Sequence, residues 1–186
     1  MAAHKITIDI FSAKSIAQAQ AALKEYKDDL VSKCKTFVEE LAKVGIQTAQ
    51  GNLGAFEKYI VFHTEVDPEK YGCQAVMVAT NNGLIKSEWY IDAFDNTKTA
   101  DVSPILMAEF GSGLKADDSY GKRQQVPMGT GTFPEQTHAE DPDGWWYQSL
   151  DGVWHHSYGV SPTYPMMRAS VAMTNRISMV AKQVFG

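Results

Sequence analysis

The sequence predicts an α+β domain in which an antiparallel sheet packs against a long N-terminal helix and a C-terminal helix, with long loops. Three observations favour this class. An apolar residue recurs every seven positions early in the chain, short β-rich segments bounded by turn residues follow, and a second helical stripe closes the sequence. Helices with one apolar stripe each can cover one face of a sheet. We therefore expect residues 1–186 to form a single domain.

Composition limits the possible functions. The chain has 186 residues and a net charge of −5, with no run of basic residues, which argues against a nucleic-acid partner wrapped on its surface. Its two cysteines, Cys34 and Cys73, cannot form a four-thiolate zinc site and are expected to be free thiols in a reducing cytosol. No signal peptide precedes "MAAHKITIDIF" and no apolar run is long enough to span a bilayer, so we expect a soluble protein made in a cytoplasm.

The N-terminal region divides into an arm and a helix. Apolar residues alternate in "HKITIDIF", and residues 1–11 are therefore expected to form a strand or an extended arm. From Ser12 a seven-residue repeat predicts an amphipathic helix of about nine turns, ended by "GNLG" at 51–54. The repeating residues are Ile16, Leu23, Leu30, Phe37 and Val44. A coiled coil is an alternative, but Gln20 and Lys27 make the second seam polar, so we expect this stripe to pack on a sheet.

Strands and one short helix are expected in the middle of the chain. "FEKYIVFHTEV" and "GCQAVMVAT" indicate two strands separated by the turn "DPEKYG", and "TNNGLIKSEWYIDAF" indicates a hairpin turning at Asn82 and Gly83. Ser103 as N-cap and Pro104 at the first helical position predict a helix of about two turns that stops at Gly111. Residues 112–143 are rich in Gly and Pro and lack periodicity, which predicts a long loop available for contacts.

The segment "GWWYQSLDGVWHHSYGV" (144–160) is aromatic and contains adjacent histidines. A two-residue turn at Asp151 and Gly152 predicts a hairpin in which Tyr147 faces His156. One face would then collect Trp145, Tyr147, Trp154, His156 and Tyr158, and the other Trp146, Gln148, Leu150, Val153, His155 and Ser157. Because His155 and His156 would point to opposite faces, they could not bind one metal ion. We expect the aromatic face to pack against the protein.

The last segment predicts a helix that begins at Pro165. Its apolar stripe comprises Met166, Ala169, Met173, Ile177, Val180 and Val184. An adaptable methionine-rich binding surface is an alternative, but core packing is the commoner use of such a stripe.

Motifs for catalysis are weak. "HAEDPDG" places His138 two residues before Glu140, as a zinc deaminase signature begins, but the Pro-Cys-x-x-Cys that completes the signature is absent. Asp141 and Asp143 do not have the spacing of an EF-hand, and we interpret the segment as a solvated acidic turn. We therefore expect no catalytic residue, no cofactor and no metal, and hence no enzyme. The alternatives are a metal-assisted hydrolase using His138, His155 or His156 with Glu140, or a monomeric host-directed binding module.

Two motifs together resemble those of the head–tail joining, or tail-completion, proteins of long-tailed bacteriophages. The first is "EFGSG", with the family's Glu-Phe-Gly turn followed by a second glycine. The second is "GWWYQSLDGVWHHSYGVSPTYPMMRAS", an aromatic hairpin leading to a proline-initiated helix. The matching positions, whose role the family suggests is structural, are Glu109, Phe110, Gly111, Gly113, Trp145, Tyr147, Asp151, Gly152, Trp154, Tyr164, Pro165, Met166 and Arg168.

The resemblance implies a structural virion protein of the neck, between the head connector and the tail. It implies a homo-oligomeric ring of six subunits that contacts a connector or head-completion protein on one side and tail-terminator or tail-tube proteins on the other. Genomic DNA would pass through the lumen without specific binding, and no membrane would be involved. The protein would be synthesised in the host bacterial cytoplasm and end in the virion.

Overall fold

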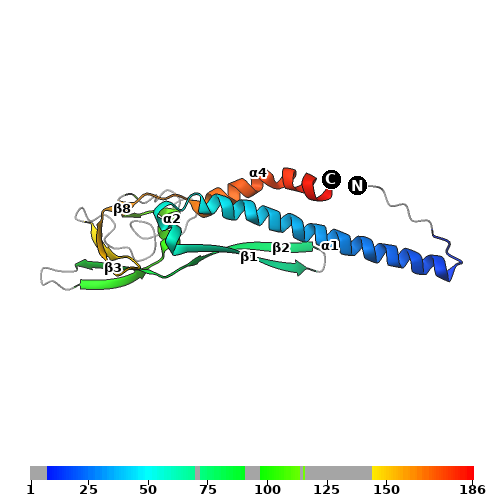
Figure 1. Ribbon diagram of the computed structural model, residues 1–186, viewed down its shortest axis with the longest axis horizontal. Helices are drawn as coiled ribbons and strands as arrows, with labels where there is room; N and C mark the ends of the chain where they lie inside the picture. Colours follow the sequence, from blue (N-terminus) through cyan, green and yellow to red (C-terminus); the bar gives the residue numbers. More distant parts are fainter. Residues whose placement is uncertain (1–7, 70–71, 91–96, 114, 116–143) are drawn as a thin grey trace, which may run out of the picture.

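The computed structural model describes residues 8–69, 72–90, 97–113, 115 and 144–186 (Figure 1). The fold is α+β, as the sequence predicts, and it is elongated. Helix α1 (Ala13–Gln50) defines the long axis, with a two-stranded hairpin on one side and helix α4 (Pro165–Phe185) on the other. The remaining strands gather with helix α2 (Pro104–Phe110) at the end of the molecule away from the start of α1.

Helix α1 begins where the sequence predicts, because the Ser12 side chain accepts a hydrogen bond from the Ser15 backbone N–H. It continues through Gly45 to Gln50 and ends at Gly51. A Cβ at Gly45 would lie 2.8 Å from the sulfur of Met173 and 3.0 Å from that of Met77. Gly45 therefore lets α4 and the hairpin approach the helix closely from both sides.

The predicted packing of the α1 stripe holds only for part of the helix. Phe37 and Val44 are partly buried, and the Phe37 ring lies 5.8 Å from that of Phe185 at the end of α4. In contrast, Ile16, Leu23 and Leu30 are exposed. The expectation that the whole stripe packs on a sheet is therefore wrong for the N-terminal half, where α1 runs on past the hairpin and α4 (Figure 1).

The hairpin beside α1 pairs strand β1 (Ile60–Glu69) with strand β2 (Gly72–Asn81) in antiparallel register, from Ile60 opposite Asn81 to Glu69 opposite Gly72. Both strands were predicted, but β1 continues through residues 67–69, which the sequence assigned to a turn. Near the tip, the Cys73 thiol lies 3.8 Å from the Val31 carbonyl oxygen of α1. Cys34 and Cys73 are both free, half-buried thiols.

A second sheet has the strand order β4-β3-β6-β7, and all its neighbours are antiparallel. Its strands are β3 (Ile85–Tyr90), β4 (Thr97–Val102), β6 (Trp145–Gln148) and β7 (Trp154–Ser157). The predicted hairpin at Asn82 and Gly83 is wrong, because β2 and β3 belong to different sheets. Gly83 has φ +93°, and the turn it allows carries the chain from one sheet to the next.

A third, two-stranded sheet shows that the predicted start of the long loop, at residue 112, is wrong. Strand β5 (Ser112–Gly113) pairs with β8 (Gly159–Val160), so the loop does not begin at residue 112. Residues 114 and 116–143 lie outside the described part of the chain. At the N-terminus, residues 1–7 also lie outside it, and Ile10 and Phe11 form an exposed turn where a strand or extended arm was expected.

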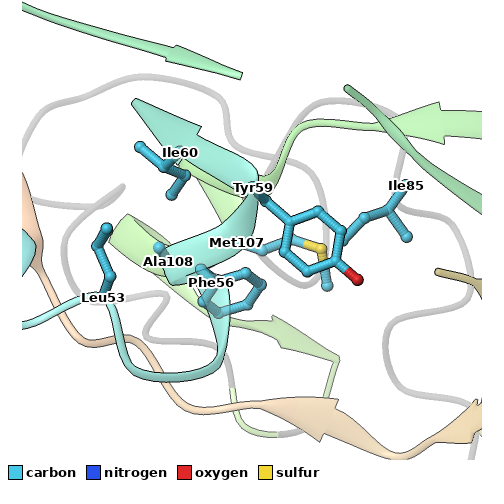
Figure 2. Close-up of a cluster of buried hydrophobic side chains, with 7 residues drawn as sticks. All are labelled: Leu53, Phe56, Tyr59, Ile60, Ile85, Met107 and Ala108. Carbon is cyan, nitrogen blue, oxygen red and sulfur yellow. The ribbon is translucent and has the colours of Figure 1, made fainter. Parts of the chain in front are cut away.

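The main hydrophobic core centres on a 3₁₀ helix, η1 (Gly54–Tyr59), that the sequence analysis missed. Leu53, Phe56 and Tyr59 are three residues apart, and a helix of three residues per turn places them on one side. The core residues are Leu53, Phe56, Tyr59, Ile60, Ile85, Met107 and Ala108. Figure 2 shows Phe56 and Met107 lying between Leu53 and Ile85. This core joins η1 and α2 to the β1–β2 hairpin and to the four-stranded sheet.

Helix α4 begins at Pro165, as predicted, and buries Ala169 and Val180 from its predicted stripe, whereas Ile177 is exposed. In the part of the chain that the structure describes, no helix is both long and apolar enough to cross a membrane.

Candidate functional site

The two sequence motifs meet at the start of α4. Glu109 is a buried residue, only 7% exposed, and its carboxylate accepts hydrogen bonds from the backbone N–H groups of Met166 (2.8 Å) and Met167 (3.0 Å). The first N–H groups of a helix have no partner within it, and Pro165 has no N–H at all. Glu109 therefore satisfies the next two donors of α4 and places a carboxylate at the positive end of the helix dipole.

Backbone contacts reinforce this junction. The Ala108 carbonyl oxygen accepts hydrogen bonds from the N–H groups of Thr163 (2.8 Å) and Tyr164 (3.2 Å). Tyr164 is the N-cap of α4 and has a left-handed backbone, with φ 54° and ψ 48°. The Arg168 side chain folds back one turn, and its Nε donates to the Thr163 carbonyl at 3.0 Å.

Position 111 needs a glycine because the segments of the two motifs pass each other there in close contact. Its φ is +79°, and a Cβ would lie 2.6 Å from the Val160 carbonyl oxygen and 2.8 Å from Cδ of Pro162. The next residue, Ser112, is fully buried and accepts a hydrogen bond from the Val160 N–H through its hydroxyl. Gly113 pairs with Gly159 in the β5–β8 ladder. Segments 108–113 and 159–168 therefore form one structural unit, which we call the motif junction.

A further contact in this region was not predicted. The Asn81 side chain donates to the Ser103 hydroxyl (2.9 Å) and accepts from the Ile105 N–H (3.1 Å), linking the end of β2 to the start of α2. The sequence identifies Ser103 as a cap, but nothing in it indicates Asn81 as its partner.

The aromatic hairpin has a different register from the predicted one. Tyr147 lies opposite His155 and Gln148 opposite Trp154, a shift of one residue. The loop contains three residues, since the Ser149 N–H donates to the Val153 carbonyl and only Gly152 has positive φ (+80°). The predicted face assignment is therefore wrong, because a one-residue shift moves every side chain of one strand to the other face.

The two histidines point to opposite faces, as predicted, though with different neighbours. His155 stacks on Tyr147 at a ring distance of 5.3 Å, and its Nε2 lies 3.2 Å from the Ser149 hydroxyl. His156 packs edge-on to Trp146 (5.0 Å). Among the described residues, no group of three His, Cys, Asp or Glu side chains could hold a metal ion. His138, Glu140, Asp141 and Asp143 lie outside those residues.

The face around His156 is open to solvent, although the sequence analysis expected an aromatic face to be packed. Trp146, Trp154 and Tyr158 are 39–57% exposed, and the Tyr158 ring contacts that of His156 at 4.7 Å. We call Trp146, Trp154, His156 and Tyr158 the aromatic patch. Exposed Trp and Tyr side chains are enriched at protein–protein contacts because they bury a large area and lose little side-chain entropy.

Asp151 stabilises the hairpin loop. Its carboxylate accepts hydrogen bonds from the Ser149 hydroxyl and from the Val153 N–H. These hydrogen bonds favour the charged form, the Ser149 contact most strongly, and hold the pKa of Asp151 below its ordinary value of 3.8. Asp151 is exposed to solvent, and this environment is typical of a structural turn residue.

Comparison with protein-family models, curated proteins and solved structures finds no match to this chain.

Proposed function

We propose that this chain is a structural protein of the bacteriophage neck, whose copies form a ring that joins the DNA-filled head connector to the tail. The observation that carries the proposal is the motif junction. Glu109, from the first motif of the resemblance, caps the helix that the second motif begins. The residues on which the resemblance rests thus act together to fix the start of α4.

The surface supports an assembly role. The aromatic patch and the exposed N-terminal half of α1 are apolar areas without a partner element in the described part of the chain, and they lie toward opposite ends of the molecule (Figure 1). Contiguous exposed apolar surface of this kind marks sites of protein contact. A subunit with two such surfaces can contact a neighbour on each side, as a closed ring requires.

Deletion of this gene from a phage that encodes it tests the proposal. Electron microscopy of lysates should show filled heads and complete tails that are not joined, and expression of the wild-type protein from a plasmid should restore joined, infectious particles. Infectious particles of normal morphology without the gene would contradict it. A stoichiometric, tightly bound zinc ion in the purified protein would also contradict it and would favour the hydrolase alternative.

A further inference from the structure

The tip of the β1–β2 hairpin lies beside the middle of α1 (Figure 1). Cys73, the second residue of β2, places its sulfur 3.8 Å from the Val31 carbonyl oxygen of the helix. Because a cysteine side chain is short, this contact shows that the β2 backbone approaches α1 closely here. Cys34 follows Val31 by three residues, and residues three apart on a helix are neighbours on its surface, with about 5–6 Å between their Cβ atoms. The Cys73 sulfur therefore lies within one helical turn of Cys34.

The side of α1 that carries Cys34 faces β2. Cys34 and Gly45 are eleven residues apart, which is close to three full turns at about 3.6 residues per turn, so they lie on the same side of the helix. A Cβ at Gly45 would lie 3.0 Å from the Met77 sulfur of β2. Helix α4 also touches Gly45, but its C-terminal end lies beside Phe37, about one turn short of Cys34. At Cys34 the neighbour of α1 on this side is therefore β2.

Strand β2 presents Cys73 on the face that packs against α1. Cys73 and Met77 are four residues apart, and the side chains of a strand alternate between its two faces. Ala75 lies between them on the same face and is also half-buried, whereas Gln74 and Val76 on the other face are exposed. The thiol of Cys73 therefore points toward the helix, as the Met77 sulfur does.

The spacing along the two elements also brings the cysteines together. Strand β2 advances about 13 Å from Cys73 to Met77, at about 3.3 Å per residue. Helix α1 advances about 17 Å from Cys34 to Gly45, at about 1.5 Å per residue. Because Met77 meets Gly45, the levels of the two cysteines differ by only about 4 Å, which is less than the Cα separation of about 4.4–6.8 Å that a disulfide spans.

We propose that Cys34 and Cys73 form a redox site, in which oxidation joins the two sulfurs in a disulfide that ties the hairpin tip to α1. The oxidant is a small-molecule disulfide of the glutathione class. One protein thiolate attacks a sulfur of the small disulfide and releases one small thiolate, and the second protein thiolate then attacks the mixed disulfide and releases the other. The new S–S bond replaces the old one. Two electrons pass from the protein sulfurs to the small disulfide, and the two thiol protons end on the two released thiols.

The surroundings of the pair suit this chemistry. The chain has two cysteines, so this is the single internal disulfide that it can form. Both are half-buried free thiols, which leaves each open to a small reagent while the fold holds it in place. A reducing cytosol keeps such thiols reduced, whereas oxidising surroundings close the bond. The redox site goes beyond the proposed neck function and does not depend on it.

Intact-mass spectrometry of the purified full-length protein tests the redox site. The protein is incubated with oxidised and reduced glutathione, and the remaining thiols are trapped by alkylation. We expect a monomeric, unalkylated product about 2 Da lighter than the unalkylated dithiol form, because closing the bond removes two hydrogen atoms. Dithiothreitol should restore both thiols. Digestion of the oxidised protein should yield one pair of peptides linked through Cys34 and Cys73.

Two controls make the test specific to the fold. At a fixed glutathione ratio, the ratio of disulfide to dithiol form should be at least about tenfold higher in folded protein than in concentrated urea, because only the fold holds the sulfurs together. Cys34→Ser and Cys73→Ser each retain one thiol and should give only a mixed disulfide with glutathione. Circular dichroism should show equal helix content in both variants and wild type.

Three results would overturn the inference. The first is wild-type protein that carries glutathione on both cysteines without an internal bond. The second is a main product with disulfides between chains, and the third is an equal ratio of disulfide to dithiol form in folded protein and in urea. Each would show that the fold does not hold the two sulfurs together, and none would affect the gene-deletion experiment.

Discussion

At the scale of single residues, the Glu109 carboxylate joins two elements that are far apart in the sequence. Replacement by Ala leaves the N–H groups of Met166 and Met167 without their acceptor in a buried position. We expect Glu109→Ala to lower the free energy of unfolding by about 1–3 kcal/mol, the usual cost of unsatisfied buried donors. Urea denaturation followed by circular dichroism measures this change.

Two variants make the Glu109 prediction specific. Glu109→Gln keeps one acceptor oxygen and should lose less stability than Glu109→Ala. Glu25→Ala removes an exposed glutamate from the projecting part of α1 and should change the free energy of unfolding by less than about 0.5 kcal/mol. Equal stability of Glu109→Ala and wild type would show that the cap does not stabilise α4.

Gly111 allows a second prediction at this scale. Gly111→Ala introduces a Cβ at 2.6 Å from a backbone oxygen on a residue with φ +79°, and we expect a loss of about 1–3 kcal/mol in the free energy of unfolding. Gly72→Ala is the control, because it has no atom within 4 Å of its Cβ position and no positive φ. Unfolding of both variants at the same urea concentration would contradict the close approach of Gly111 to the Val160 carbonyl.

Some of these residue roles are visible in the sequence and others are not. Ser103 with Pro104 signals a helix start, and Gly152 signals a positive-φ position, because each acts on its own neighbours in the chain. Glu109 acts on residues nearly sixty positions away, and Asn81 acts on another element. Glu and Asn side chains are most often solvated, so only the fold shows that these two form hydrogen bonds to distant parts of the chain.

At the scale of elements, the sequence predicts helices better than strand pairings. All three helices begin where the sequence predicts, and α2 does so at its predicted cap, Ser103, since the signals that start a helix are local. The aromatic hairpin was placed at the right turn but in the wrong register. A two-residue turn of the Asp-Gly type needs positive φ at both residues, whereas here Asp151 keeps negative φ and uses its carboxylate to close a three-residue loop.

The same carboxylate predicts a pH dependence for the hairpin. Since folding lowers the pKa of Asp151 below 3.8, its stabilising effect is fully present above that pH and is lost as the pH falls through the folded-state pKa. We expect the hairpin to loosen at pH values below about 4, with a shift in tryptophan fluorescence from Trp146 and Trp154. Asp151→Asn should lack this component of the transition. An identical acid transition in wild type and Asp151→Asn would assign the effect to other carboxylates.

The extent to which α1 is covered could not be predicted from its own pattern. The seven-residue stripe is equally regular in both halves, but Phe37 is packed and Leu23 is not. What differs is where α4 and the hairpin end, and this depends on their lengths and on the motif junction that positions α4. The stripe therefore specified a helix-packing surface without specifying which part the chain itself would fill.

At the scale of the whole molecule, this difference divides α1 into a supported part and an unsupported part. An isolated helix of the length of residues 13–30 is marginally stable in water, whereas residues 37–50 are held by α4 and the hairpin. In dilute protein, hydrogen–deuterium exchange followed by mass spectrometry should therefore be at least about tenfold faster in peptides from 13–30 than in peptides from 37–50. Peptides from α4 provide an internal control, because α4 packs on the supported part of α1 and should be protected to a similar degree. Uniform protection along α1 in dilute protein would mean that its N-terminal half is already covered, and the molecule would then offer no unpaired helix to a neighbour.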